Sequence, residues 1–81
     1  MIVNVKFFAV YRDLTGEDTV QIECNAGTDG AALLDKLRER FPALASLQNP
    51  GRLAVNCEFA PLDTALQDQD EVTFIAPVSG G

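Results

Sequence analysis

The 81-residue sequence contains no histidine and no tryptophan, and only two cysteines, Cys24 and Cys57. A structural zinc site needs four nitrogen or sulfur ligands, and a plant-type iron–sulfur cluster needs four cysteines. Both kinds of site are therefore excluded within this chain. The two cysteines do not form a CxxC pair. We interpret them as buried, reduced thiols, and a bridge between them stays open.

Basic residues are also scarce, since six Lys and Arg stand against twelve Asp and Glu and the net charge is −6. Proteins that follow a phosphate backbone need clustered cations, so we expect no nucleic acid partner. The acidic excess favours a positively charged protein surface instead. Neither a long apolar run nor a signal-peptide pattern is visible. We therefore expect no membrane association and a cytoplasmic location.

A chain of this length is expected to form one domain with a small core. Such a core leaves little room for an enclosed catalytic cavity, and no nucleophile stands beside a base in a recognisable pattern. A carrier or binding module is therefore a better interpretation than a self-sufficient enzyme.

Alternating apolar and polar residues predict two antiparallel strands at the start of the chain. The core face of the first would comprise Val3, Val5, Phe7 and Ala9, which leaves Phe8 on the other face. The core face of the second would comprise Val20, Ile22 and Cys24. Residues 12–18 are polar and include Gly16, which predicts a hairpin-type connection between the strands.

A helix is predicted next, with Thr28 as its N-cap and Asp29 in its first turn. Pro42 should end it near Phe41, because proline disrupts a helix interior. Apolar residues recur at helical spacing at Leu33, Leu34, Leu37 and Phe41. This stripe is most simply a core contact against a sheet.

The second half of the sequence predicts short elements. We expect a turn at 49–51, strands at 53–55 and 58–60, a helical turn at 63–66, a turn at 67–70 and a last strand whose core face holds Val72, Phe74 and Ala76. Ile75 then falls on the other face. The whole pattern indicates an α+β domain with one main helix packed on one face of a mixed sheet. It does not settle the strand order.

The sequence ends Ala76-Pro77-Val78-Ser79-Gly80-Gly81. Pro77 has no backbone N–H, so strand pairing should stop there. Gly80 and Gly81 lack Cβ atoms, so a narrow channel could admit them, and four extended residues reach about 14 Å. These properties suit a reactive terminus that enters another protein. We expect one folded domain over 1–77 and a flexible Gly-Gly tail over 78–81.

Two blocks of the sequence resemble a known family. The first is Val5-Lys6-Phe7-Phe8-Ala9 with Arg12-Asp13-Leu14 and Gly16. The second is Val55-Asn56, then Pro61-Leu62-Asp63-Thr64-Ala65-Leu66-Gln67-Asp68-Gln69-Asp70-Glu71-Val72, with the ending from Pro77 to Gly81. Together they resemble the small, sulfur-carrier subunits of molybdopterin synthase, which have a ubiquitin-like β-grasp fold. Ala76 and Gln69 depart from the family pattern, which often has proline and glycine at these positions.

The resemblance implies a function in molybdenum cofactor biosynthesis. An ATP-dependent adenylyltransferase of the ubiquitin-activating type would adenylate the Gly81 carboxylate, which then becomes a thiocarboxylate. The tail, with Pro77, Val78, Ser79 and Gly80, would enter the large catalytic subunit of a heterotetramer, where sulfur passes to a pyranopterin precursor. The chain itself would be a non-catalytic sulfur donor, and it would keep no cofactor bound.

A partner-binding surface is also implied. Phe8 and Ile75 would share an exposed apolar patch if the first and last strands are neighbours, and Phe59 could join them. The resemblance matches these three residues, together with Arg12, to the family's contact surface.

Two alternatives stay open. The chain could carry sulfur in another pathway, such as thiamine-thiazole, thiolated tRNA or cysteine synthesis, although the segments 7–9 and 77–79 favour molybdopterin. It could also be a ubiquitin-like modifier that is joined to lysines through Gly81.

Overall fold

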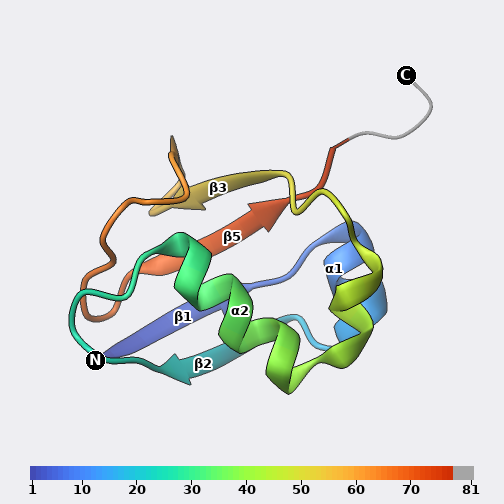
Figure 1. The fold of residues 1–81 in the computed structure, drawn as a ribbon, viewed down its shortest axis with the longest axis horizontal. Coiled ribbons are helices and arrows are strands. Elements are labelled where there is room, and N and C mark those ends of the chain that lie inside the picture. Colours follow the sequence, from blue (N-terminus) through green and yellow to red (C-terminus); the bar gives the residue numbers. More distant parts are fainter. Residues whose placement is uncertain (78–81) are drawn as a thin grey trace.

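The computed structural model describes residues 1–77 of the chain. Its elements are, in order, β1 (Ile2–Lys6), α1 (Ala9–Thr15), β2 (Thr19–Glu23), α2 (Gly30–Arg40), the 3₁₀ helix η1 (Pro42–Ser46), β3 (Arg52–Val55), β4 (Glu58–Ala60) and β5 (Glu71–Ile75). The strands form one mixed sheet in the order β2-β1-β5-β3-β4 (Figure 1). Strands β1 and β5 are parallel, and the other neighbours are antiparallel. The predicted α+β class and mixed sheet are confirmed.

Helix α2 covers one face of the sheet, as predicted (Figure 1). Because side chains alternate between the two faces of a strand, every second strand residue points toward this helix. The core that results contains Val3, Val5, Val20, Ile22, Leu33, Leu34, Leu37, Leu53, Val72 and Phe74, together with residues from the connections. The intervening strand residues face away from α2. None of the helices within residues 1–77 is long and apolar enough to cross a membrane.

Local residues define the two ends of α2. Asp29, rather than the predicted Thr28, is the N-cap, and its side chain accepts a hydrogen bond of 2.8 Å from the backbone N–H of Ala32. Gly30 follows at the first helical position. A Cβ there would lie 2.6 Å from Cδ2 of Leu53, so glycine lets the helix begin close against β3. The helix ends at Arg40, before Pro42, as expected.

The predicted hairpin-type connection between the first two strands is wrong. Strand β1 ends at Lys6, and the chain then forms helix α1, which leaves Ala9 exposed rather than in the core. The cause is the burial of Tyr11, whose ring stacks with those of Phe7 and Phe74 at centroid distances of 6.4 and 6.0 Å. Its hydroxyl donates a 2.7 Å hydrogen bond to the carbonyl of Pro50, and burial raises the Tyr11 pKa.

The predicted helical turn at 63–66 is also wrong. This segment is a loop that pairs with the residues before α2: Ala65 forms an isolated bridge with Asp29, and the N–H of Leu66 donates to the carbonyl of Thr28 at 2.9 Å. Leu66 is thereby buried in the core. Pairing with a distant segment and burial of one leucine outweigh the weak local preference for a helical turn.

The acidic turn at 67–70 is a bonded structure in its own right. The side chain of Asp70 accepts hydrogen bonds from the backbone N–H of Gln67 at 2.8 Å and from the Asn56 amide at 2.9 Å. The amide oxygen of Asn56 in turn accepts from the N–H of Glu71 at 3.0 Å. These bonds join the β3–β4 turn to the start of β5.

Gly51 occupies the tightest position among the glycines of residues 1–77. Its φ is +86°, and a Cβ there would overlap the carbonyl oxygen of Ile75 and lie 2.7 Å from Cα of Ala76. Glycine at this position therefore lets the residue before β3 lie directly against the end of β5. Any side chain would displace the last strand where it approaches Pro77.

We expect Gly51→Ala to lower the free energy of unfolding by about 3 kcal/mol, because it adds overpacking against backbone to the cost of a left-handed φ. Gly27→Ala is the matched control, since Gly27 has a φ of +89° but no atom within 4 Å of the added Cβ. It should cost about 1 kcal/mol. Urea denaturation of both variants measures the difference, and equal losses would show that the contact with Ile75 is unimportant.

Candidate functional site

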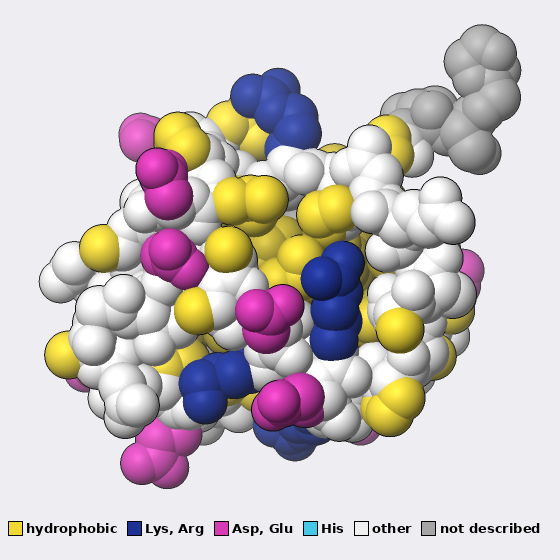
Figure 2. Space-filling model, in the orientation of Figure 1, with side chains coloured by type: hydrophobic (Ala, Val, Ile, Leu, Met, Phe, Trp, Pro, Cys, Tyr) yellow, Lys and Arg dark blue, Asp and Glu magenta, His cyan; other side chains and the backbone are white. Residues whose placement is uncertain are grey.

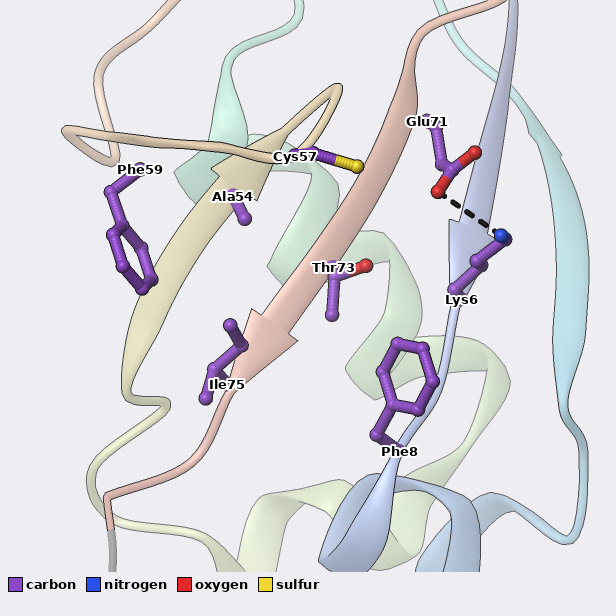
Figure 3. A pocket seen from close by; sticks show the side chains of 8 residues that line it. All are labelled: Lys6, Phe8, Ala54, Cys57, Phe59, Glu71, Thr73 and Ile75. Carbon is purple, nitrogen blue, oxygen red and sulfur yellow. Dashed lines mark ion pairs between the residues drawn. The ribbon is translucent and has the colours of Figure 1, made fainter.

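The face of the sheet that points away from α2 carries a pocket of about 340 Å³. Figure 3 shows its side chains in front of the sheet, with α2 behind it. We call it the open-face pocket, and its lining residues are Lys6, Phe8, Ala54, Cys57, Phe59, Glu71, Thr73 and Ile75. They come from β1, β3, β4, β5 and the segments that follow β1 and β3.

The strand register assembles this pocket. Thr73 pairs with Lys6 of β1 on one side and with Ala54 of β3 on the other, and Ala54 also pairs with Phe59 of β4. Ala54 and Thr73 have small side chains, so they form the floor of the pocket. The apolar side chains around it are large and exposed, at 57% for Phe8, 55% for Phe59 and 44% for Ile75. Exposed apolar patches of this kind mark partner-binding sites.

One end of the pocket carries an ion pair. Nζ of Lys6 lies 3.1 Å from Oε1 of Glu71, and both side chains are about two-fifths exposed (Figure 3). An exposed pair of this type contributes little to stability. It does pair the two charged side chains that line the open-face pocket. The surface on the α2 side of the molecule, seen in Figure 2, carries Lys and Arg side chains scattered among Asp and Glu around a hydrophobic centre.

The structure brings together three of the predicted site residues, Phe8, Phe59 and Ile75. Pro77 lies beside two of them, in a hollow of about 290 Å³ that Phe8 and Ile75 also line. Arg12 lines neither space. Its Nε lies 2.7 Å from Oδ1 of Asp18, next to α1. The predicted tail residues Val78, Ser79, Gly80 and Gly81 lie outside the described residues.

Several pocket residues were not identified from the sequence. The period of two in the first and last strands would have placed Lys6 and Thr73 beside Phe8 and Ile75. Cys57 gave no such signal, because it reaches the pocket through a tight β3–β4 turn in which its own φ is +69°. Arg52 was missed as well, and its guanidinium carbon lies 3.7 Å from the centre of the Phe59 ring.

The two cysteines differ in their surroundings, and both are free thiols. Cys24 is buried, as expected, whereas the expectation that Cys57 is buried is wrong. Burial raises the pKa of the Cys24 thiol, and the positive charges of Lys36 and the amino terminus only partly oppose this. Cys24 therefore has little thiolate at neutral pH.

We expect iodoacetamide to alkylate Cys57 within minutes at neutral pH and Cys24 far more slowly, because the thiolate is the reactive form and Cys24 is both buried and protonated. Intact-mass measurement over time should show one adduct and then, much later, a second. The Cys57→Ser variant should show only the slow phase, and both thiols should react at once in guanidinium chloride. Equal rates in the folded protein would contradict the assigned burial.

The ThiS family matches residues 5–81 of the chain. The molybdopterin synthase sulfur carrier subunit of Mycobacterium tuberculosis is 40% identical over 80 residues, which cover 98% of this chain and 96% of the relative. The corresponding subunit of Haemophilus influenzae is 36% identical over 81 residues, with 98% and 99% covered.

Solved structures show the same fold. Small archaeal modifier protein 1 of Haloferax volcanii superposes with a TM-score of 0.86 at 27% identity, over 95% of this chain and 98% of that one. A chain in the complex of subunits 1 and 2 of the molybdopterin-converting factor of Helicobacter pylori has a TM-score of 0.70 at 29% identity, with both chains fully covered. The expected ubiquitin-like β-grasp fold is confirmed. This chain therefore belongs to the ThiS family, and within it to the molybdopterin synthase sulfur carrier subunits.

Proposed function

We propose that this chain carries sulfur for molybdopterin synthesis on the carboxyl group of Gly81. The observation that supports this most strongly is its 40% identity, over nearly the full length of both chains, to a molybdopterin synthase sulfur carrier subunit. The structure adds that Pro77, the last described residue, lies beside an exposed apolar patch. A surface that docks on a partner would therefore also direct the end of the chain into it.

The proposed chemistry begins with activation, because a carboxylate is a poor acyl donor. A carboxylate oxygen of Gly81 attacks the α-phosphorus of ATP and releases pyrophosphate, which leaves an acyl adenylate. A sulfur nucleophile then displaces AMP and forms the thiocarboxylate. An adenylyltransferase of the ubiquitin-activating type binds the ATP, so this chain keeps no cofactor. Its cytoplasmic location is part of the same proposal.

The loaded chain would then bind the large catalytic subunit of molybdopterin synthase, in a heterotetramer. The similarity to a chain in a complex of subunits 1 and 2 of a molybdopterin-converting factor supports this partner. Residues 77–81 would enter the large subunit, where sulfur passes to the pyranopterin precursor and water restores the Gly81 carboxylate. Catalytic acids and bases would come from the large subunit.

The open-face pocket is the proposed contact surface, with Phe8, Phe59 and Ile75 as its main anchors. Large, exposed apolar side chains at the centre of an interface commonly dominate its binding energy. Arg12 would contribute at the edge, where its pairing with Asp18 leaves the two side chains 64% and 73% exposed. The net charge of −6 would speed the encounter with a basic partner surface.

Deletion of Gly81 should abolish adenylation and thiocarboxylate formation, because the terminal carboxylate would no longer reach the activating enzyme's nucleotide. The measurement is the intact mass of the chain after incubation with that enzyme, ATP and a sulfur donor. Leu62→Ala, which leaves residues 77–81 unchanged, is the control and should still exchange one oxygen for sulfur. A truncated chain that supports molybdopterin formation would refute the proposed function.

Phe8→Ala should weaken binding to the large subunit at least about tenfold, as expected for an anchor residue. The free energy of unfolding of the Phe8→Ala variant should change little, since the Phe8 side chain is 57% exposed. Leu62→Ala is the matched control, because Leu62 is also exposed but lies outside the open-face pocket. Binding can be followed by calorimetry, and by slower alkylation of Cys57 in the complex. Equal affinities for the two variants would exclude this surface.

The similarity to small archaeal modifier protein 1 favours a second candidate, a ubiquitin-like modifier. The same mass measurement separates the candidates when it is made on chain isolated from cells. Sulfur carriage predicts free chain, part of it with one oxygen replaced by sulfur. Modification predicts chain joined through Gly81 to lysines of other proteins.

A further inference from the structure

Arg52 lies on the open face of the sheet, next to two of the proposed anchor residues. It pairs directly with Ile75 across β3 and β5, and it precedes Ala54 by two residues, so it lies on the same face as both. Its guanidinium carbon is 3.7 Å from the centre of the Phe59 ring on β4. This distance is well within the range of a cation–π interaction.

The contact with Phe59 is the specific interaction that the structure gives Arg52. The ion pairs among residues 1–77 involve Lys6, Arg12 and Arg38, and none of them includes Arg52. The side-chain hydrogen bonds of this part of the chain do not include it either; the one donated by an arginine comes from Arg40. Arg52 is therefore oriented by the aromatic ring rather than by a carboxylate.

The Phe59 ring lies in an exposed position at the edge of the sheet. It belongs to a strand of three residues at the edge of the sheet and is 55% exposed. The aromatic pairs among residues 1–77 join Phe7, Tyr11, Phe41 and Phe74, and none of them includes Phe59. An exposed ring on an edge strand has several accessible rotamers unless a neighbour restricts them.

The two hollows on either side of Phe59 show how the contact is arranged. Phe59 lines the open-face pocket and also a second hollow of about 420 Å³, whereas Arg52 lines only the second. The Phe59 side chain thus borders both spaces, and the guanidinium that contacts its ring borders the second hollow alone.

We propose that Arg52 is a positioning residue that holds the Phe59 ring as the outer wall of the open-face pocket, ready for the large subunit. The inference rests on the proposed function, because the proposed function names the large subunit as the partner of that surface. Its physical basis is preorganisation: a ring that is already held in place loses less conformational freedom on binding. Arg52 acts through Phe59, and its effect must vanish when the ring is absent.

The test compares Arg52→Gln with Arg52→Lys, using Arg40→Gln as the matched control. Arg40 also lies over an aromatic ring, that of Phe41 at 5.5 Å, but it belongs to α2 on the other side of the sheet. Calorimetry with the large subunit should show about fivefold weaker binding for Arg52→Gln, as expected for loss of one exposed cation–π contact. Arg52→Lys should lose less, and Arg40→Gln should bind normally.

Two further readouts separate positioning from a general loss of stability. In the free chain, Arg52→Gln should move the NMR signals of the Phe59 ring while the urea midpoint stays nearly unchanged. In a Phe59→Ala background, the additional change from Arg52→Gln should cause no further loss of affinity. Additive losses would overturn the proposal, since Arg52 would then contact the partner independently of the ring.

The result for Phe59→Ala alone distinguishes this proposal from the proposed function. If Phe59→Ala weakens binding and Arg52→Gln does not, the positioning role is wrong and the docking surface stands. If neither Phe8→Ala nor Phe59→Ala weakens binding, the docking surface and the positioning role fail together.

Discussion

The parallel pairing of β1 with β5 is the constraint on which the rest of this structure depends. Lys6 of β1 pairs with Thr73 of β5, so the two strands run in the same direction and end on the same side of the sheet. Phe8 and Ile75 each follow two residues later. An antiparallel pair would have placed them at opposite ends. The pairing thus places the exposed side chains of Phe8, just after β1, and Ile75, at the end of β5, beside Pro77, the last described residue.

The two faces of the sheet have separate tasks. One face, with Val3, Val5, Val72 and Phe74, is buried under α2 and supplies most of the core of a small protein. The other face keeps large apolar side chains exposed to water, which has a free-energy cost for the isolated domain. This cost is consistent with a face that is covered in a complex.

A close backbone contact and several side-chain hydrogen bonds hold this arrangement at the two ends of β5. Gly51 lets the chain before β3 lie against the end of β5, and Tyr11 ties α1 to the neighbouring Pro50. At the opposite end, Asn56 and Asp70 join the β3–β4 turn to the start of β5. Strand β5 is therefore held at both ends, and the position from which residues 78–81 continue is defined by packed structure rather than by a loose terminus.

Much of the fold followed from local patterns, because alternation in strands and spacing in a helix depend only on which side chains must be buried. These patterns predicted the α+β class, the main helix and the exposed positions of Phe8 and Ile75. Helix α1 and the loop at 63–66 were not predicted, because each depends on contacts between residues far apart in the chain. The exposure of Cys57 was not predicted because it depends on a tight turn with positive φ angles. The pattern indicated which side chains face away from the core. Only the tertiary structure, through the order of the strands, decided that Arg52, Phe59, Phe8 and Ile75 lie next to one another.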